Sequence, residues 1–173
     1  MKQPKPRLGR WIPPDENLVK TNFNGTFLKE EGAAGIGVVI RNSTGQVLAA
    51  LSEKIHAPAS VTVLEMLAAR RAVAFTRELG IERCILEGDS HIVVKALHDG
   101  DKIFSEFGHL LQDTLSHLNS LRNWSLSHTF RQGNAVADDL ARRAKLSFPF
   151  AIWLDSVPLD LIPFVNADLL PSQ

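Results

Sequence analysis

The stretch LVKTNFNGTF, residues 18–27, decides the fold. Its alternating apolar and polar residues predict a β-strand, and further strand-like runs follow it in the sequence. Two Gly-containing turns follow, EEGAAG at 30–35 and STG at 43–45. They lead into GIGVVIRN at 35–42 and QVLAALSEKIH at 46–56, both typical of strands. Three short strands joined by such turns favour an antiparallel meander.

Helical and strand patterns alternate beyond this meander. The later strands are reached through helices, so we expect them to lie parallel to the first strand, with right-handed connections. The sequence therefore predicts an α/β fold in which a five-stranded mixed sheet carries helices on both faces. In chain order, the later expected elements are helix 60–80, strand 83–89, helix 91–98, helix 107–122, strand 123–130 and helix 134–147, with Ser90 and Asn134 as caps.

Composition points to one ordinary globular domain. The 173 residues are 45% hydrophobic and 22% charged, and 19 basic residues balance 19 acidic ones, so the whole chain carries no basic signal for nucleic acid. The single cysteine, Cys84, excludes an intrachain disulfide and leads us to expect an intracellular location, nuclear or cytoplasmic, with an organelle not excluded. The basic N-terminus lacks the apolar core of a secretory signal, and no apolar run is long enough to span a membrane.

Proline and charge patterns divide the chain into three parts. We expect a flexible basic N-terminal arm at 1–16, a domain at 17–147 and a C-terminal extension at 148–173. A monomer is expected.

The Gly-rich stretch GAAGIGVV, residues 32–39, resembles a phosphate-binding loop, but β-branched residues follow it and predict a strand. Such a loop must open a helix, so the dinucleotide interpretation is disfavoured.

Three acidic residues are placed where a site could form. Glu65 lies early in the first long helix, Asp89 ends the fourth strand, and Asp138 lies in the first turns of the final helix. Ligand sites in open α/β sheets form at the carboxyl ends of strands, and hard oxygen ligands suit Mg²⁺ or Mn²⁺. Each residue taken alone is better explained as an ordinary solvated or capping carboxylate.

Five pieces of the chain, taken in order, resemble one family. They are WIPP with KTNFNGT at 11–26, GIGVVIRNSTGQV at 35–47, LEMLAARRAV at 64–73, ILEGDSHIVVKAL at 85–97 and HTFRQGNAVADDLARRA at 128–144. The chain resembles the ribonuclease H family (type 1-like), specifically plant domains related to the ribonuclease H module of non-LTR retroelements. The segment from Trp153 to Leu169 is similar to the tail of those plant proteins.

The resemblance implies a ribonuclease H-like fold with strand order 3-2-1-4-5, and cleavage of the RNA strand of an RNA–DNA hybrid by two Mg²⁺ or Mn²⁺ ions. The two ions of such centres lie about 3.5–4 Å apart. By this resemblance the catalytic and metal-binding residues are Glu65, Asp89, Asp138 and the first-strand position, which is normally aspartate. That position here is Asn24.

An asparagine at this position should weaken hydrolysis. The family aspartate is expected to bridge both ions, whereas an amide offers one neutral oxygen and an NH₂ that points donors at a cation. One lost charge 4 Å from a cation costs about 4 kcal/mol at an effective dielectric constant near 20, or at least about a thousandfold in rate. Three origins of Asn24 are open: natural drift, engineered inactivation or a compensated active variant. The alternative function for the chain is a non-catalytic domesticated module that binds nucleic acid or another protein.

Hybrid binding should rest on phosphate and 2′-OH contacts. The zero net charge and the absence of a Lys/Trp-rich protrusion predict modest, salt-sensitive affinity. One residue of this set, His128, is interpreted equally well as an ordinary strand residue. The candidate nucleic-acid-binding residues are Gly25, His128, Arg131, Asn134 and Arg142, the last in a basic cluster with Arg143 and Lys145.

Overall fold

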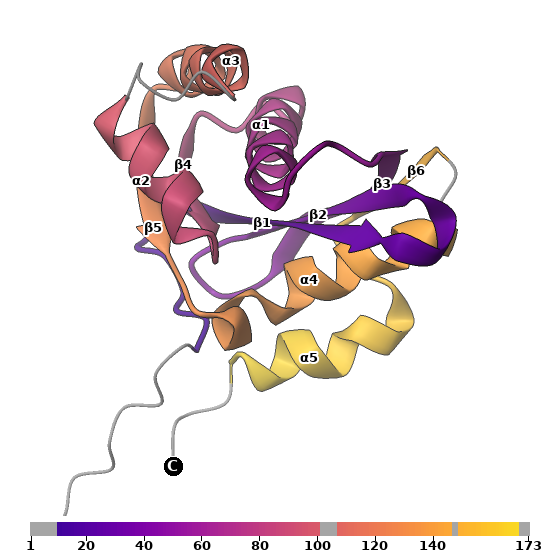
Figure 1. The fold of residues 1–173 in the computed structure, drawn as a ribbon. Coiled ribbons are helices and arrows are strands. Elements are labelled where there is room, and N and C mark those ends of the chain that lie inside the picture. The colour runs from indigo at the N-terminus through magenta and orange to yellow at the C-terminus, as the bar shows by residue number, and fades with distance from the viewer. Residues whose placement is uncertain (1–9, 101–106, 147–148, 170–173) are drawn as a thin grey trace, which may run out of the picture.

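The structure is a computed structural model that describes residues 10–100, 107–146 and 149–169. Its centre is a six-stranded sheet in the order β5-β4-β1-β2-β3-β6 (Figure 1). The strands are β1 (Val19–Leu28), β2 (Ala33–Arg41), β3 (Val47–His56), β4 (Arg83–Gly88), β5 (Asn123–His128) and β6 (Phe150–Leu154).

Helices cover both faces of this sheet (Figure 1). One face carries α1 (Val61–Glu78), α2 (His91–Asp99) and α3 (Gly108–Asn119), and the other carries α4 (Ala135–Arg142) and α5 (Ile162–Ala167). Ser60 and Ser90 cap α1 and α2 through their hydroxyl groups, as their residue types favour. No helix of the described ranges is both long and apolar enough to cross a membrane.

The pairing of the strands confirms the predicted α/β fold. β1, β2 and β3 form an antiparallel meander, and β4 and β5 join in parallel beside β1. The five predicted strands therefore have the expected order 3-2-1-4-5. In the registers, Asn24 pairs with Gly37 of β2, and Phe23 pairs with Gly88, the residue before Asp89.

The predicted strand count was one too low, because β6 adds to the free edge of β3 in antiparallel pairing. Its sequence, FAIWL, is a five-residue apolar run without polar alternation, and periodicity cannot assign such a run to strand or helix. Residue 148, the first of the predicted C-terminal extension, lies outside the described residues, and β6 joins the rest of that extension to the sheet.

The start of the described chain also packs against the sheet. Residues 1–9 of the predicted flexible arm lie outside the described residues. Trp11, which the sequence assigns to that arm, is 1% exposed and among the largest fully buried side chains. Its indole lies over the guanidinium of Arg41 on β2, 3.9 Å from Cζ to the ring centroid. The segment around residue 11 is therefore part of the folded unit.

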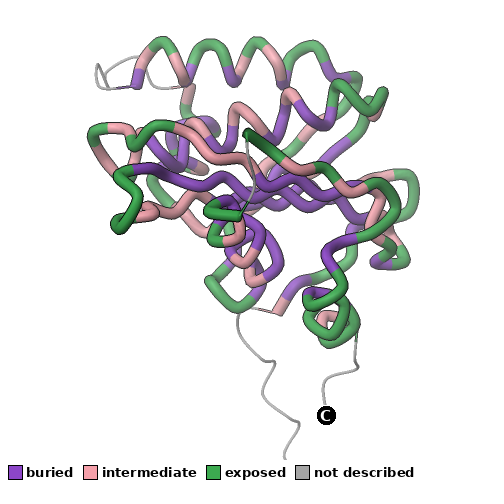
Figure 2. The backbone as a smooth tube through the Cα atoms, turned by 90° about the vertical axis from the view of Figure 1, so that its right-hand side faces the viewer, coloured by how far each residue is buried: buried purple, intermediate pink, exposed green. Residues whose placement is uncertain are grey.

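The core has two parts, one on each side of the sheet, and the buried residues follow its central strands (Figure 2). On the α4 side, Gly35 and Gly37 let the helix backbone come unusually close. A Cβ added to Gly37 would lie 2.1 Å from the carbonyl oxygen of Ala137, and one on Gly35 would lie 2.0 Å from that of Ala141. Gly35 and Gly37 of GAAGIGVV thus serve helix–sheet packing on a strand, in agreement with the rejection of a phosphate loop.

Candidate active site

Four side chains from four elements converge where the carboxyl end of β4 meets the middle of β1. Asn24 comes from β1, Glu65 from the start of α1, Asp89 from the residue after β4 and Asp138 from the first turn of α4. Asn24 Nδ2 donates to Asp138 Oδ1 at 2.9 Å. The backbone N–H of Gly25 donates to Glu65 Oε1 at 3.3 Å. The structure thus brings together the four residues named from the sequence.

Asn24 is bonded in a way that an aspartate could not be. Its NH₂ faces the carboxylate of Asp138, and this orientation is the consistent one, because the amide oxygen would meet a carboxylate oxygen if the group were flipped. Arg142, one turn along α4, donates to Asp138 Oδ2 and also pairs with Asp139. The bond to Asp138 raises the pKa of Arg142. Both oxygens of Asp138 therefore have donors supplied by the chain itself.

Glu65 is the most strongly perturbed carboxyl of the site. Its side chain is 6% exposed, and burial, with the charges of Asp89 and Asp138, raises its pKa to about 8 against the lowering effect of the Gly25 hydrogen bond. Within the described residues its Oε2 is buried without a hydrogen-bond partner. An unpaired oxygen in a cluster of acidic groups has the chemistry of a cation ligand.

The donor set is nevertheless incomplete for a metal centre. In the part of the chain that the structure describes, no three His, Cys, Asp or Glu side chains form a group that could hold an ion as they lie. Asn24 presents an amide donor to Asp138, and Arg142 occupies the second oxygen of that carboxylate. Glu65 and Asp89 fit a divalent cation by their chemistry, whereas Asp138 would have to exchange its present partners for one.

Basic and aromatic groups border Asp89. Burial and Asp138 raise the pKa of Asp89, and the nearby Arg131 and His128 act against that rise. His128 is the last residue of β5, so its placement as a strand residue holds, but its Nε2 also lies 3.2 Å from the carbonyl oxygen of Asp89. Its ring packs edge-on against His91 and Phe130, with centroids 5.5 and 5.8 Å apart. Arg131 is exposed beside it, so this border can meet a ligand.

Asn134 was predicted to cap α4 and to contact nucleic acid, and the structure differs on both roles. It makes no side-chain cap on α4, and it is 0% exposed, so in this structure it cannot contact nucleic acid. Its Nδ2 instead donates to the carbonyl oxygen of Phe23 at 2.9 Å, and its Oδ1 accepts from Asn22 Nδ2 at 3.1 Å. Asn134 therefore holds the start of α4 against β1 rather than serving as a surface contact.

Gly25 and Arg142 also have structural roles. A Cβ on Gly25 would lie 2.7 Å from Cγ of Leu64, so close packing of α1 on β1 requires glycine there. Arg142 is 55% exposed in its side chain but paired with Asp138 and Asp139, and Arg143 pairs with Asp160. Most of the predicted basic cluster is thus balanced by neighbouring acids.

Sequence reasoning missed a buried polar group beneath the site. Asn22 is 0% exposed and bonds to Trp11, Glu87 and Asn134. A signal for it existed, because residues i and i+2 of a strand share a face, so Asn22 had to lie on the same side as Asn24. An amide buried on that face needs hydrogen-bond partners from the elements that pack there.

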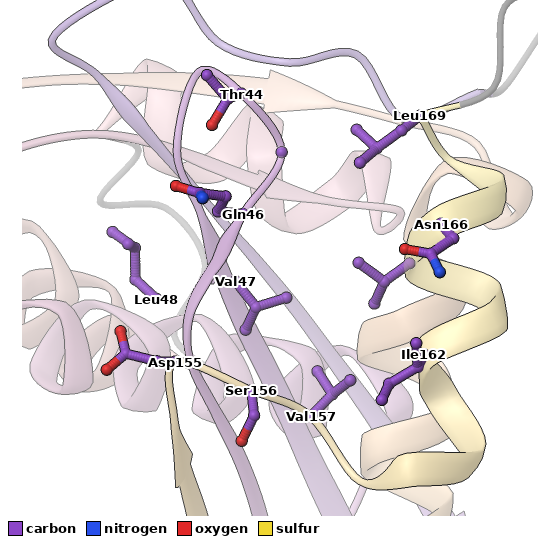
Figure 3. Close-up of a pocket in the computed structure, with 12 residues that line it drawn as sticks. Thr44, Gln46, Val47, Leu48, Asp155, Ser156, Val157, Ile162, Asn166 and Leu169 are labelled. Carbon is purple, nitrogen blue, oxygen red and sulfur yellow. The ribbon is translucent and has the colours of Figure 1, made fainter.

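A cavity of about 440 Å³ lies away from the acidic site, between α5 and the turn joining β2 to β3 (Figure 3). Its lining includes Val47, Val157, Ile162 and Leu169, and none of the four converging residues takes part in it. Asn24, Glu65 and Asp138 are themselves buried, and the exposed groups beside them include Phe130 and Arg131.

Comparison with known proteins agrees with this geometry. The family model described as Reverse transcriptase-like matches residues 22–144, more than half of the chain. The chain belongs to this family. A putative ribonuclease H protein of Arabidopsis thaliana is 28% identical over 171 residues, which are 96% of this chain and 26% of that protein. The chain thus spans about a quarter of the length of this curated relative.

Solved structures place this reverse transcriptase-like chain in the ribonuclease H fold. Ribonuclease H1 from Halobacterium salinarum has a TM-score of 0.68 and 26% identity, covering 74% of this chain and 97% of that one. LC11-RNase H1 in complex with an RNA/DNA hybrid has a TM-score of 0.57 and 24% identity, covering 73% and 95%, and shows the fold. The resemblance to the ribonuclease H family is thereby confirmed. β6 and α5 lie beyond the last residue of the family match.

Proposed function

We propose that this chain is a ribonuclease H-like domain that binds RNA–DNA hybrid, and that Asn24 weakens or abolishes its hydrolysis of the RNA strand. The observation that carries the proposal is the hydrogen bond from Asn24 Nδ2 to Asp138 Oδ1, at the point where the family resemblance calls for two carboxylates. The hybrid-bound relative supports the ligand class, since its fold is shared.

Bound Mg²⁺ or Mn²⁺ in such a centre supplies an activated water and stabilises the leaving oxygen of the cleaved phosphodiester. Glu65, Asp89 and Asp138 would hold the ion. Glu65 keeps Oε1 fixed on the Gly25 N–H and has Oε2 available, while burial makes its carboxylate form costly without a cation. Asp89 extends from the end of β4 toward the same point.

Asn24 acts against this centre in two ways. It removes one negative charge, worth about 4 kcal/mol beside a cation 4 Å away at an effective dielectric constant near 20. It also engages Asp138 as a donor, so a cation must displace that hydrogen bond before Asp138 can serve as a ligand. The expected result is at least about a thousandfold slower hydrolysis than with aspartate at this position.

The hybrid would lie across the carboxyl end of β4, held through its backbone. Arg131 and His128 flank Asp89 and can meet a phosphate, and the exposed Phe130 beside them offers an apolar face. Arg142 is exposed but shared with Asp138, so its contribution is reduced. With zero net charge overall, binding should be modest and should weaken as salt rises.

A paired hydrolysis assay tests the proposal. The chain and its Asn24→Asp variant are compared on an RNA–DNA hybrid with Mg²⁺ and with Mn²⁺, and Asn119→Asp adds the same charge at an exposed position on α3 as a matched control. Only Asn24→Asp should gain rate. Fast and equal turnover by all three proteins would refute the role given to Asn24.

A second candidate is a non-catalytic module that uses the fold for protein interaction. The donors that already occupy both oxygens of Asp138 favour it, because the site is satisfied without a cation. Backbone NMR decides between the two candidates. If neither Mg²⁺ nor Mn²⁺ shifts the resonances of Asp89 and Asp138, and hybrid does not bind, the interaction module is the better account.

A further inference from the structure

Three segments far apart in the sequence meet around Arg41. The indole of Trp11 stacks on its guanidinium, and Arg41 Nη1 pairs with Asp168 Oδ2 at 2.7 Å. Arg10 Nη2 donates to the backbone oxygen of Asp168 at 3.2 Å. Burial lowers the pKa of Arg41 while Asp168 counteracts the shift. The segment before β1 and the end of α5 are therefore fastened to β2 at one point.

The polar edge of Trp11 begins a directed chain of side-chain hydrogen bonds. Trp11 Nε1 donates to Asn22 Oδ1 at 3.1 Å. Asn22 Nδ2 donates to Asn134 Oδ1 at 3.1 Å and to Glu87 Oε2 at 2.8 Å. Asn134 Nδ2 then donates to the carbonyl oxygen of Phe23 at 2.9 Å. We call Trp11, Asn22 and Asn134 the amide relay.

The direction of the amide relay follows from the indole, because Trp Nε1–H can only donate. Asn22 must turn its oxygen toward Trp11, which leaves its NH₂ for Asn134 and Glu87. Asn134 must then accept through its oxygen and donate to Phe23. Each amide has one orientation that satisfies all of its neighbours, and the acceptors Glu87 and the Phe23 carbonyl require the same orientations as the Trp11 donor.

The amide relay ends at both halves of the candidate active site. The carbonyl of Phe23 immediately precedes Asn24, and Asn134 immediately precedes α4, which carries Asp138. The relay therefore links the strand and the helix whose side chains meet in the Asn24–Asp138 hydrogen bond. Residues 10–12 and the end of α5 lie outside the family match of 22–144, yet they anchor this arrangement.

We propose that Trp11 is a positioning residue: its indole N–H, held in place by the Arg41–Asp168 pair, anchors Asn22 and through it Asn134, and so fixes the spacing of residues 24 and 138. Its consequence for hydrolysis rests on the proposed function, but the relay itself does not. The segment around residue 11 thus helps to position the site residues rather than forming a separate flexible arm.

The test without ligand is Trp11→Phe, which keeps an aromatic ring over Arg41 and removes the N–H together with the pyrrole part of the indole. The side-chain amide resonances of Asn22, Asn134 and Asn24 should all shift in ¹⁵N–¹H spectra, while that of the exposed Asn119 should not. Trp153→Phe, a matched control on β6, should leave all three unchanged. A response confined to Asn22 would overturn the proposal.

A second variant covers the case in which Trp11→Phe does not fold. Asp168→Asn weakens the pair with Arg41 and leaves every member of the relay in place, so the same three amide resonances should shift by smaller amounts. No shift at Asn134 and Asn24 in a folded Asp168→Asn protein would contradict the anchoring role.

The functional consequence is measured in the Asn24→Asp background. Adding Trp11→Phe should lower kcat about tenfold or more with little change in KM, since misplacement of a catalytic group by about 1 Å can cost 100-fold. In this double variant, broadening of the Asp89 and Asp138 resonances by Mn²⁺ should require a higher Mn²⁺ concentration. Unchanged kcat and Mn²⁺ affinity would overturn the positioning role. If Asn24→Asp itself gains no activity, the proposed function fails, and the amide measurement still stands.

Discussion

Replacing Asn24 with aspartate should destabilise the metal-free protein, even though aspartate is the residue that the family resemblance calls for. The Nδ2 atom lies 2.9 Å from Asp138 Oδ1, so Asn24→Asp puts a carboxylate oxygen against another carboxylate. Losing a hydrogen bond to a charged group costs about 1.5–3 kcal/mol. Two unit charges about 3 Å apart repel by about 5 kcal/mol at an effective dielectric constant of 20, and proton uptake or a small displacement relieves part of this.

The net cost at neutral pH should be about 2–4 kcal/mol of unfolding free energy, which lowers Tm by about 4–16 °C for a chain of this size. A divalent cation that binds only the folded variant should restore the lost unfolding free energy. The gain is about 2.7 kcal/mol when the cation concentration is one hundred times its dissociation constant. The chain with Asn24 should respond much less, because Asn24 and Arg142 already satisfy Asp138.

Thermal unfolding in EDTA and in increasing Mg²⁺ or Mn²⁺ measures both effects, with Asn119→Asp as the control for an added charge. Asn24→Asp should melt lowest in EDTA and gain most from the metal. A variant as stable as the parent in EDTA, with no gain from either cation, would refute the account of the Asn24–Asp138 contact.

Three further perturbations have separate expected outcomes. Without metal, Glu65 has its pKa raised from 4.5 to about 8, so its contribution to stability is present at low pH and is lost as pH rises through that range, by about 1.4 kcal/mol per unit. Glu65→Gln should therefore gain stability relative to the parent between pH 4.5 and 8 in urea unfolding, and a constant difference would contradict the raised pKa. Gly37→Ala should lose about 1–3 kcal/mol, because its Cβ would lie 2.1 Å from the Ala137 oxygen, while Gly108→Ala, with no atom within 4 Å, should lose nothing. Arg131→Ala should weaken hybrid binding and reduce its log–log salt slope by about 1 in fluorescence anisotropy, whereas an unchanged slope would remove Arg131 from the phosphate contacts.

The order of strands and the convergence of the acidic residues could be predicted because they follow from local patterns. Strand alternation placed Asn24 on one face of β1, and the strand end placed Asp89 at the edge where ligands bind. The pattern also placed Glu65 and Asp138 near the starts of their helices, and the family resemblance then grouped them with Asn24, which the structure brings to the same point. These positions depend on helix and strand periodicity more than on distant contacts.

The misses concern residues whose role depends on tertiary partners. Asn134 has the residue type and position of a helix cap, yet its amide finds better partners in Asn22 and the Phe23 carbonyl. Trp11 follows a basic, Pro-containing segment and precedes two prolines, so nothing local predicts that it is buried over Arg41. β6 becomes a strand because the open edge of β3 is there to pair with it.

The identity of residue 24 should decide how fast this chain cleaves an RNA–DNA hybrid. The rate of RNA-strand hydrolysis in an RNA–DNA hybrid, measured with Mg²⁺ and with Mn²⁺ for the chain and for Asn24→Asp, tests this claim. We predict that Asn24→Asp cleaves at least about a thousandfold faster, because it restores the charge beside Glu65, Asp89 and Asp138. Equal rates for the two proteins, whether both fast or both absent, would contradict it.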